Sequence, residues 1–147
     1  MNPDERIKQF ISKQTCANVC CVDEGGHPHC FTCFYSFDPE EMLLHYKSSN
    51  ETYHSTLLLK RPMVAGTIVP DSLNVLQIKG IQFLGIILPF DHSHYKDASS
   101  HYHSKHLIAL MMPGEIWTIK LTSIKFTDNT LGFGKKLLWE RALFPTE

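Results

Sequence analysis

Residues 42–68, MLLHYKSSNETYHSTLLLKRPMVAGTI, predict a strand, a polar loop, a helix and a second strand within one short stretch. The strands are expected at 42–46 and 63–68, where apolar residues predominate. The helix is expected at 52–60, because Pro62 cannot continue it and forces Arg61 out of helical geometry. This stretch predicts a chain that mixes helices with short strands.

The loop at 47–54 brings hydroxyl groups, Lys47 and His54 to the start of that helix. Unpaired backbone N–H groups and the positive end of the helix dipole favour an anion there, phosphate above all. Ser49 or Thr52 can instead simply cap the helix, which is the commoner role of Ser and Thr at helix starts. Both interpretations remain open from these residues alone.

The remaining elements follow from alternation and from turn residues. Helices are predicted at 2–14, from the start Asn2-Pro3-Asp4-Glu5, and at 91–109, where Leu107 and Ile108 should complete the buried side. Further strands are predicted at 15–23, 29–37, 75–88, 115–121 and 123–127. Glycines at 80 and 85 should bend the longest of these strands. Six or seven hairpin-linked strands and three helices predict an antiparallel barrel with helices on its outside.

Composition limits the class of protein. The 147 residues, 43% of them hydrophobic, fit one globular domain spanning 1–147. The net charge of -1, from 14 basic and 15 acidic side chains, argues against a broad nucleic-acid surface. With no run of about 18 apolar residues and no signal-peptide pattern, we expect a cytoplasmic protein that does not span a membrane. The odd count of five cysteines is typical of reduced thiols.

Two clusters imitate metal sites. Cysteines and histidines crowd residues 16–33, but Cys30 and Cys33 lie three apart on a predicted strand and point to opposite faces. Cys20 and Cys21 are adjacent on a predicted strand, so they also point to opposite faces and cannot bind one metal ion. Structural thiols are therefore the better interpretation. Five histidines also fall within 92–106, where only His103 and His106 could share a helix face. Without the acidic residue of a H-E-x-x-H motif, we interpret them as a solvated face that gains charge below about pH 6.5.

The segment 124–139, IKFTDNTLGFGKKLLW, closely resembles the YhbP-like branch of the pyridoxamine 5′-phosphate oxidase-like, FMN-binding split-barrel proteins. The stretches GIQF at 80–83 and VAGT at 64–67 resemble the same family, with matching element order over nearly the whole chain. The resemblance implies a mainly β fold with flanking helices, a six-stranded antiparallel split β-barrel. It also implies a homodimer that holds two FMN molecules between its subunits.

The same resemblance assigns the loop after the strand at 42–46 to the FMN phosphate. Ser48 and Thr52 would supply hydroxyl groups, with Ser49 beside them in the loop. The family commonly has an Arg-Lys or Arg-His pair where this chain has Tyr53 and His54, and the missing guanidinium removes a strong bidentate contact.

The other residues assigned by resemblance lie elsewhere in the chain. Lys47 could replace the missing cation, and Thr32 and Gln82 would lie near the isoalloxazine ring. Lys135 and Trp139 could reach the partner's cleft, although core or dimer packing accounts equally well for a tryptophan. If His54 binds the phosphate, FMN affinity should fall as this side chain deprotonates above neutral pH.

The leading hypothesis is therefore an FMN-binding flavoprotein, an oxidoreductase of unknown substrate in which the flavin carries the chemistry. The alternative is a non-enzymatic split-barrel module that binds another ligand such as haem, with histidines as axial ligands. Tyr53, which stands where the family usually has an arginine, favours this alternative because it weakens the expected phosphate site. A shared fold does not fix the ligand.

Overall fold

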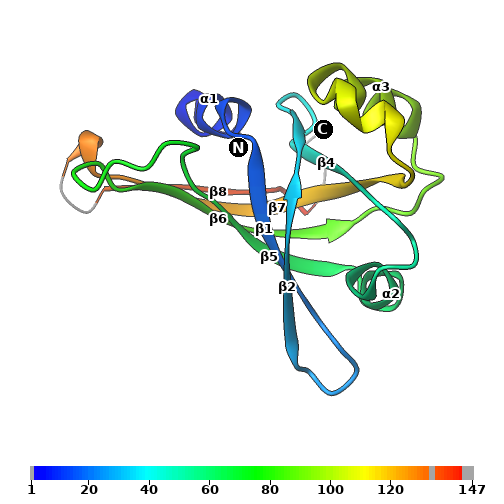
Figure 1. Ribbon diagram of the computed structural model, residues 1–147. Helices are drawn as coiled ribbons and strands as arrows, with labels where there is room; N and C mark the ends of the chain where they lie inside the picture. The colour runs from blue at the N-terminus through cyan, green and yellow to red at the C-terminus, as the bar shows by residue number, and fades with distance from the viewer. Residues whose placement is uncertain (1, 133–134, 144–147) are drawn as a thin grey trace.

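An antiparallel sheet of eight strands carries three α-helices in the computed structural model, which describes residues 2–132 and 135–143 (Figure 1). The strand order is β2-β1-β5-β6-β7-β4-β3, and β8 pairs with β7. The strands are β1 (Cys16–Val22), β2 (Pro28–Phe34), β3 (Ser36–Asp38), β4 (Leu43–Ser48), β5 (Met63–Ile68), β6 (Lys79–Ile87), β7 (Glu115–Asp128) and β8 (Lys136–Glu140). The helices are α1 (Glu5–Lys13), α2 (Tyr53–Lys60) and α3 (Tyr95–Lys105), with 3-10 turns η1 (Leu107–Met111) and η2 (Asn129–Leu131).

The order expected for residues 42–68 is confirmed as β4, α2 and β5. Thr52 is the N-cap of α2, and its side chain accepts a hydrogen bond from the Ser55 N–H. The helix ends at Lys60, directly before Arg61-Pro62. The capping interpretation of Thr52 therefore holds in the structure.

The prediction of a six-stranded barrel is wrong, because the described residues form eight strands. Residues 115–128 are one continuous strand, since β7 pairs first with β4 and then with β8 along the same edge. β8 itself lies in a segment with no predicted strand, and residues 75–78 precede β6 instead of extending it. The expected bend appears as a register shift between Leu84 and Gly85. Phe133 and Gly134 of the resembling segment lie outside the described residues.

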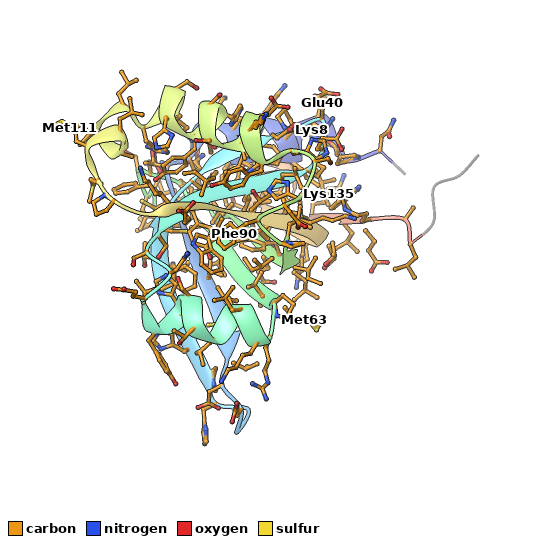
Figure 2. The ribbon with its side chains drawn as sticks, turned by 90° about the vertical axis from the view of Figure 1, so that its right-hand side faces the viewer. Lys8, Glu40, Met63, Phe90, Met111 and Lys135 are labelled. Carbon is orange, nitrogen blue, oxygen red and sulfur yellow. The ribbon has the colours of Figure 1, made fainter. Side chains whose placement is uncertain are left out.

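The helix boundaries also differ from the prediction. Asp4, not Asn2, caps α1 by accepting a hydrogen bond from the Arg6 N–H. α3 ends at Lys105, and Leu107 and Ile108 are exposed on η1 instead of buried. Figure 2 shows η1 reaching the edge of the molecule at Met111. None of the described helices is long and apolar enough to cross a membrane.

The sheet curls into a half-barrel around one main apolar core (Figure 1). α1 and α2 each contribute apolar side chains to this core, although Leu59 of α2 is exposed. α3 packs Ala98 and Tyr102 against Ile116 of β7 in a second cluster. The edge strand β2 approaches β4 without a ladder between them in the described part of the chain. Their side chains meet instead, with the rings of Phe31 and Tyr46 5.6 Å apart. This unpaired seam is the split of the barrel.

A substitution at Gly66 tests how tightly β5 packs against its neighbouring strands in the half-barrel. A Cβ on Gly66 would collide with the Phe83 ring and come within 2.6 Å of the Asn18 carbonyl oxygen, whereas a Cβ on Gly80 meets only the Ile68 carbonyl oxygen at 3.5 Å. We expect Gly66→Ala to lower the free energy of unfolding by about 1–3 kcal/mol. Urea denaturation measures it, with Gly80→Ala as the matched control that stays near wild type. Equal stability of the two variants contradicts the packing described for β5.

Candidate functional site

A polar row crosses five adjacent strands of the sheet. Directly opposite residues in an antiparallel ladder have their side chains on the same face. Asn18 is opposite Thr32 on one side and Thr67 on the other. Thr67 is opposite Gln82, and Gln82 is opposite Lys125. The Thr32 hydroxyl donates a hydrogen bond to Asn18 Oδ1 at 2.8 Å, so two members of this polar row already contact each other.

A groove of about 530 Å³ lies over the polar row, and we call it the sheet groove. The residues that line it all belong to strands, so no described helix covers this part of the sheet. Beside the polar row, a second row of opposite residues completes the floor of the sheet groove: Cys30, Cys20, Ala65, Leu84, Ser123 and Glu140. The groove therefore offers amides, hydroxyls, one lysine and the carboxylate of Glu140, with Ala65 and Leu84 as apolar floor between them.

A second cavity of about 270 Å³ lies at the seam between β2 and β4, and we call it the split cavity. His54, at the start of α2, stacks on Phe31 with ring centroids 3.8 Å apart and an interplanar angle of 9°. Its Nε2 atom lies 2.8 Å from the Ser48 hydroxyl. Thr32 lines the split cavity and Asn18 lines the sheet groove, so their hydrogen bond joins the two.

The electrostatics of the split cavity favour neutral side chains. Burial, followed by the nearby His29, lowers the pKa of His54 below its usual 6.5. Burial also raises the pKa of the Cys33 thiol to about 12. Burial likewise raises the pKa of Tyr46, whose buried hydroxyl has no hydrogen-bond partner among the described residues. In the free protein the pKa of His54 therefore lies below its usual value, and the pH dependence of FMN affinity expected from the sequence stays a prediction.

The structure separates the residues predicted for the phosphate. Lys47 directs its ammonium group away from the loop, toward the Ala109 carbonyl oxygen at 2.7 Å and His103 Nε2 at 3.0 Å. The Ser49 hydroxyl accepts a hydrogen bond from the Glu51 N–H at 3.2 Å. Tyr53 is exposed, meets the His29 ring of β2 edge-on and does not line the split cavity. Four predicted residues remain together at the split cavity: Thr32, Lys47, Ser48 and His54.

The residues predicted near the isoalloxazine ring and at the partner's cleft lie in different parts of the structure. Gln82 lies in the polar row of the sheet groove. Trp139 is only 5% exposed and belongs to the main core, which agrees with its alternative interpretation as a packing residue. Lys135 is exposed between η2 and β8, and it lines neither the sheet groove nor the split cavity.

Sequence reasoning missed Asn18, Thr67 and Lys125. Each occupies an exposed or half-exposed strand position, where a polar residue alone is unremarkable. The signal that joins them is strand pairing, and pairing between distant strands is absent from local alternation. Only the Asn18–Thr32 contact could have been found, by extending the predicted hairpin outward from its Gly25-Gly26 turn.

The histidine helix is not a purely solvated face. His103 and His106 are half-buried and connect α3 to the sheet, and His106 Nε2 donates to the Tyr35 carbonyl oxygen at 2.7 Å. The cysteines alternate as predicted, with Cys30 exposed and Cys33 turned toward the core. In the described part of the chain, no group of three or more His, Cys, Asp or Glu is arranged to hold a metal ion.

Comparison with known proteins gives the family. No family model matches the chain. The chain is 37% identical over 142 residues to a UPF0306 protein of Yersinia pseudotuberculosis serotype O:3 (strain YPIII), covering 95% of this chain and 96% of that one. The chain belongs to the UPF0306 family. A second UPF0306 member, plu4501 of Photorhabdus laumondii, is 34% identical over 135 residues, covering 92% of this chain and 94% of its own length.

Solved structures share the fold of this UPF0306 protein at low sequence identity. A haem-binding protein from Mycobacterium smegmatis superimposes with a TM-score of 0.79 and 13% identity, over 95% of this chain and 59% of the other. A FAD-binding protein from Mesorhizobium loti gives 0.67 and 14%, over 84% and 93%. HutZ, a haem storage protein from Vibrio cholerae, gives 0.61 and 15%, over 82% and 89%. These neighbours are split-barrel proteins, so the mainly β split-barrel fold is confirmed and the ligand is not.

The pKa of His54 gives a direct test of the split cavity. We expect the His54 ring to titrate below pH 6.5 in an NMR pH series, because burial and then the charge of His29 disfavour the imidazolium. His29→Gln should raise the midpoint by removing that charge. His27→Gln, a change to an exposed histidine of the same hairpin, should leave it in place. A midpoint at or above 6.5 in the wild type contradicts this account.

Proposed function

We propose that this UPF0306 protein binds FMN in the sheet groove between two copies of the chain and acts as a flavin-dependent oxidoreductase. The observation that carries the proposal is the polar row, which places amide, hydroxyl and ammonium groups in one line beside a strip that includes Cys20, Ala65 and Leu84. The resemblance of segment 124–139 to the YhbP-like branch of FMN-binding proteins supports the same cofactor.

The donor set of the polar row fits the polar edge of an isoalloxazine ring. That edge carries carbonyl oxygens and an N–H, which match the amides of Asn18 and Gln82 and the hydroxyl of Thr67. The apolar side chains of Ala65 and Leu84 suit the dimethylbenzene end. The groove volume, about 530 Å³, falls within the range of about 300–1,000 Å³ typical of cofactor sites.

The residues available for the FMN phosphate support the proposal less strongly than those available for the ring. Ser48 and His54 at the start of α2 provide a hydroxyl and an imidazole, and the helix N-terminus adds its dipole. The imidazole is uncharged at neutral pH in the free protein, and Lys47 is bound to Ala109 and His103. A phosphate beside His54 would favour the imidazolium, so FMN binding should take up a proton near neutral pH.

A second copy of the chain would close the groove. Exposed apolar side chains gather on the groove face of β5, β6 and β8, where Met63, Leu84 and Leu138 are 73%, 54% and 71% exposed. Figure 2 shows Met63 at the surface beside the end of α2. Apolar surface of this kind, rimmed by polar residues, is typical of protein interfaces. The homodimer is therefore part of the proposal.

When bound, FMN would supply the hydride and electron chemistry. The chain would orient the ring through Asn18 and Gln82. Lys125 would stabilise negative charge on the reduced ring, because a cation near the pyrimidine edge favours the anion. The partner copy would exclude water from the groove.

Haem is the second candidate ligand. A neutral imidazole is the form that coordinates iron, and the lowered pKa keeps His54 in that form at neutral pH. Its surroundings in the split cavity include Phe31, Tyr46, Tyr102 and Met112. However, the volume of about 270 Å³ lies below the usual range for a cofactor site, so haem would require β2 and β4 to move apart. This requirement ranks haem second.

Titration of the purified full chain with FMN tests the proposal. We expect quenching of flavin fluorescence, and a roughly tenfold weaker affinity for Gln82→Leu, since a lost hydrogen bond corresponds to about 1.4 kcal/mol. Gln77→Leu makes the same change at an exposed position outside the sheet groove and should bind like wild type. Absence of quenching, or equal weakening in both variants, overturns the assignment of FMN to the groove.

Titration with haem separates the second candidate. If FMN is the ligand, haem should give no saturable Soret shift. A one-to-one Soret band that His54→Ala abolishes and Gln82→Leu preserves would establish haem at the split cavity instead.

A further inference from the structure

Cys20 and Cys30 face each other across the β1–β2 hairpin. The hydrogen bonds of this ladder fix the kind of pair. The Asp23 N–H donates to the His27 carbonyl oxygen at 3.0 Å, and the Tyr35 N–H donates to the Thr15 carbonyl oxygen at 3.0 Å. Hydrogen-bonded and non-hydrogen-bonded pairs alternate along an antiparallel ladder. Alternating from the hydrogen-bonded pair Asp23–His27 at one end, or from Thr15–Tyr35 at the other, makes Cys20–Cys30 a non-hydrogen-bonded pair. In pairs of this kind the opposite side chains lie closest.

The spacing of such a pair suits a disulfide. Opposite Cα atoms in non-hydrogen-bonded pairs are about 4.5 Å apart, within the range of about 4.4–6.8 Å that disulfides span. The neighbouring pair of the same kind, Asn18 and Thr32, is in side-chain contact at 2.8 Å. The two thiols also interact: burial raises the pKa of Cys20, and a side-chain hydrogen bond with Cys30 raises it further.

The other three cysteines have no such partner in the hairpin. Cys16 is opposite Phe34, Cys21 is opposite His29, and Cys33 is opposite Ala17. Position also separates the pair from the other three cysteines, since the exposed Cys30 and the half-buried Cys20 line the sheet groove and Cys16, Cys21 and Cys33 do not. A reagent that enters the groove therefore meets two adjacent thiols.

We propose that Cys20 and Cys30 are a redox-active dithiol that closes to a cross-strand disulfide by exchange with a small-molecule disulfide such as oxidised glutathione. The Cys30 thiolate attacks a sulfur of oxidised glutathione, and one glutathione leaves. The Cys20 thiolate then attacks the Cys30 sulfur of the mixed disulfide, and the second glutathione leaves. Two protein thiols are oxidised by two electrons, one glutathione disulfide is reduced to two thiols, and the two protons pass to them.

The redox state of this pair changes the sheet groove. Cys20 is directly opposite Ala65 of β5, so the dithiol belongs to the second row of the floor, next to the polar row. Oxidation replaces two thiols by one disulfide there and connects β1 to β2 covalently. The inference stands on the hairpin geometry alone and does not depend on which ligand the groove binds.

The test uses the reduced full chain incubated with oxidised glutathione, quenched with acid and alkylated. Mass spectrometry should show loss of two hydrogens, a fall from five alkylated cysteines to three, and a peptide that links Cys20 to Cys30. Cys20→Ser should instead retain glutathione on Cys30. Cys16→Ser and Cys33→Ser, the matched controls, should still form the link.

Three results overturn the proposal. The wild type accumulates only mixed disulfides, the link joins other cysteines, or Cys30 pairs with Cys30 of a second copy in a dimer that persists on a non-reducing gel. The wild-type peptide map decides among these outcomes without any variant, so a variant that fails to fold leaves the test intact.

Discussion

The register of the antiparallel sheet is the constraint on which the rest of this structure depends. Because side chains alternate between faces, a slip of one residue in β6 would turn Gln82 into the core and expose Phe83. The core prevents such a slip, since Phe83 packs against Gly66 with no space for a Cβ. The polar row is therefore held in line by the apolar residues on the opposite face of the same strands.

The turn at residues 24–26 sets the register of the first hairpin. The Gly26 N–H donates to the Asp23 carbonyl oxygen at 3.1 Å, and Gly26 has a φ of 78°, a conformation that L residues with side chains rarely adopt. Asp23 supports the turn by accepting hydrogen bonds from the Gly25 and His27 N–H groups. The same register places Thr32 against Asn18 and Cys30 against Cys20, so one turn positions a polar contact and a thiol pair.

Much of the fold could be predicted from local sequence, and the site only in part. Pro62 and the Thr52 cap defined α2, alternation located β1 and β2, and a run of mainly apolar residues located β5. The strand count was wrong, because the length of β7 depends on β4 and β8 pairing with it in succession, which no local pattern records. Of the residues predicted for the phosphate loop, Ser48 and His54 contact each other, whereas Lys47 and Tyr53 have partners outside the loop. The polar row joins strands distant in sequence and became visible only through their pairing.

The position of Lys47 bears on the anion affinity proposed for the loop at 48–54. His103 Nδ1 donates to the Ser99 carbonyl oxygen, so its Nε2 atom accepts from Lys47, and the Ala109 carbonyl oxygen accepts a second hydrogen bond. Hydrogen bonds to a charged group contribute about 1.5–3 kcal/mol each. A phosphate 4 Å from the ammonium would gain about 4 kcal/mol at an effective dielectric constant of 20. The two terms are of similar size, so moving Lys47 to the loop adds little net affinity, and Ser48 and His54 must provide most of it.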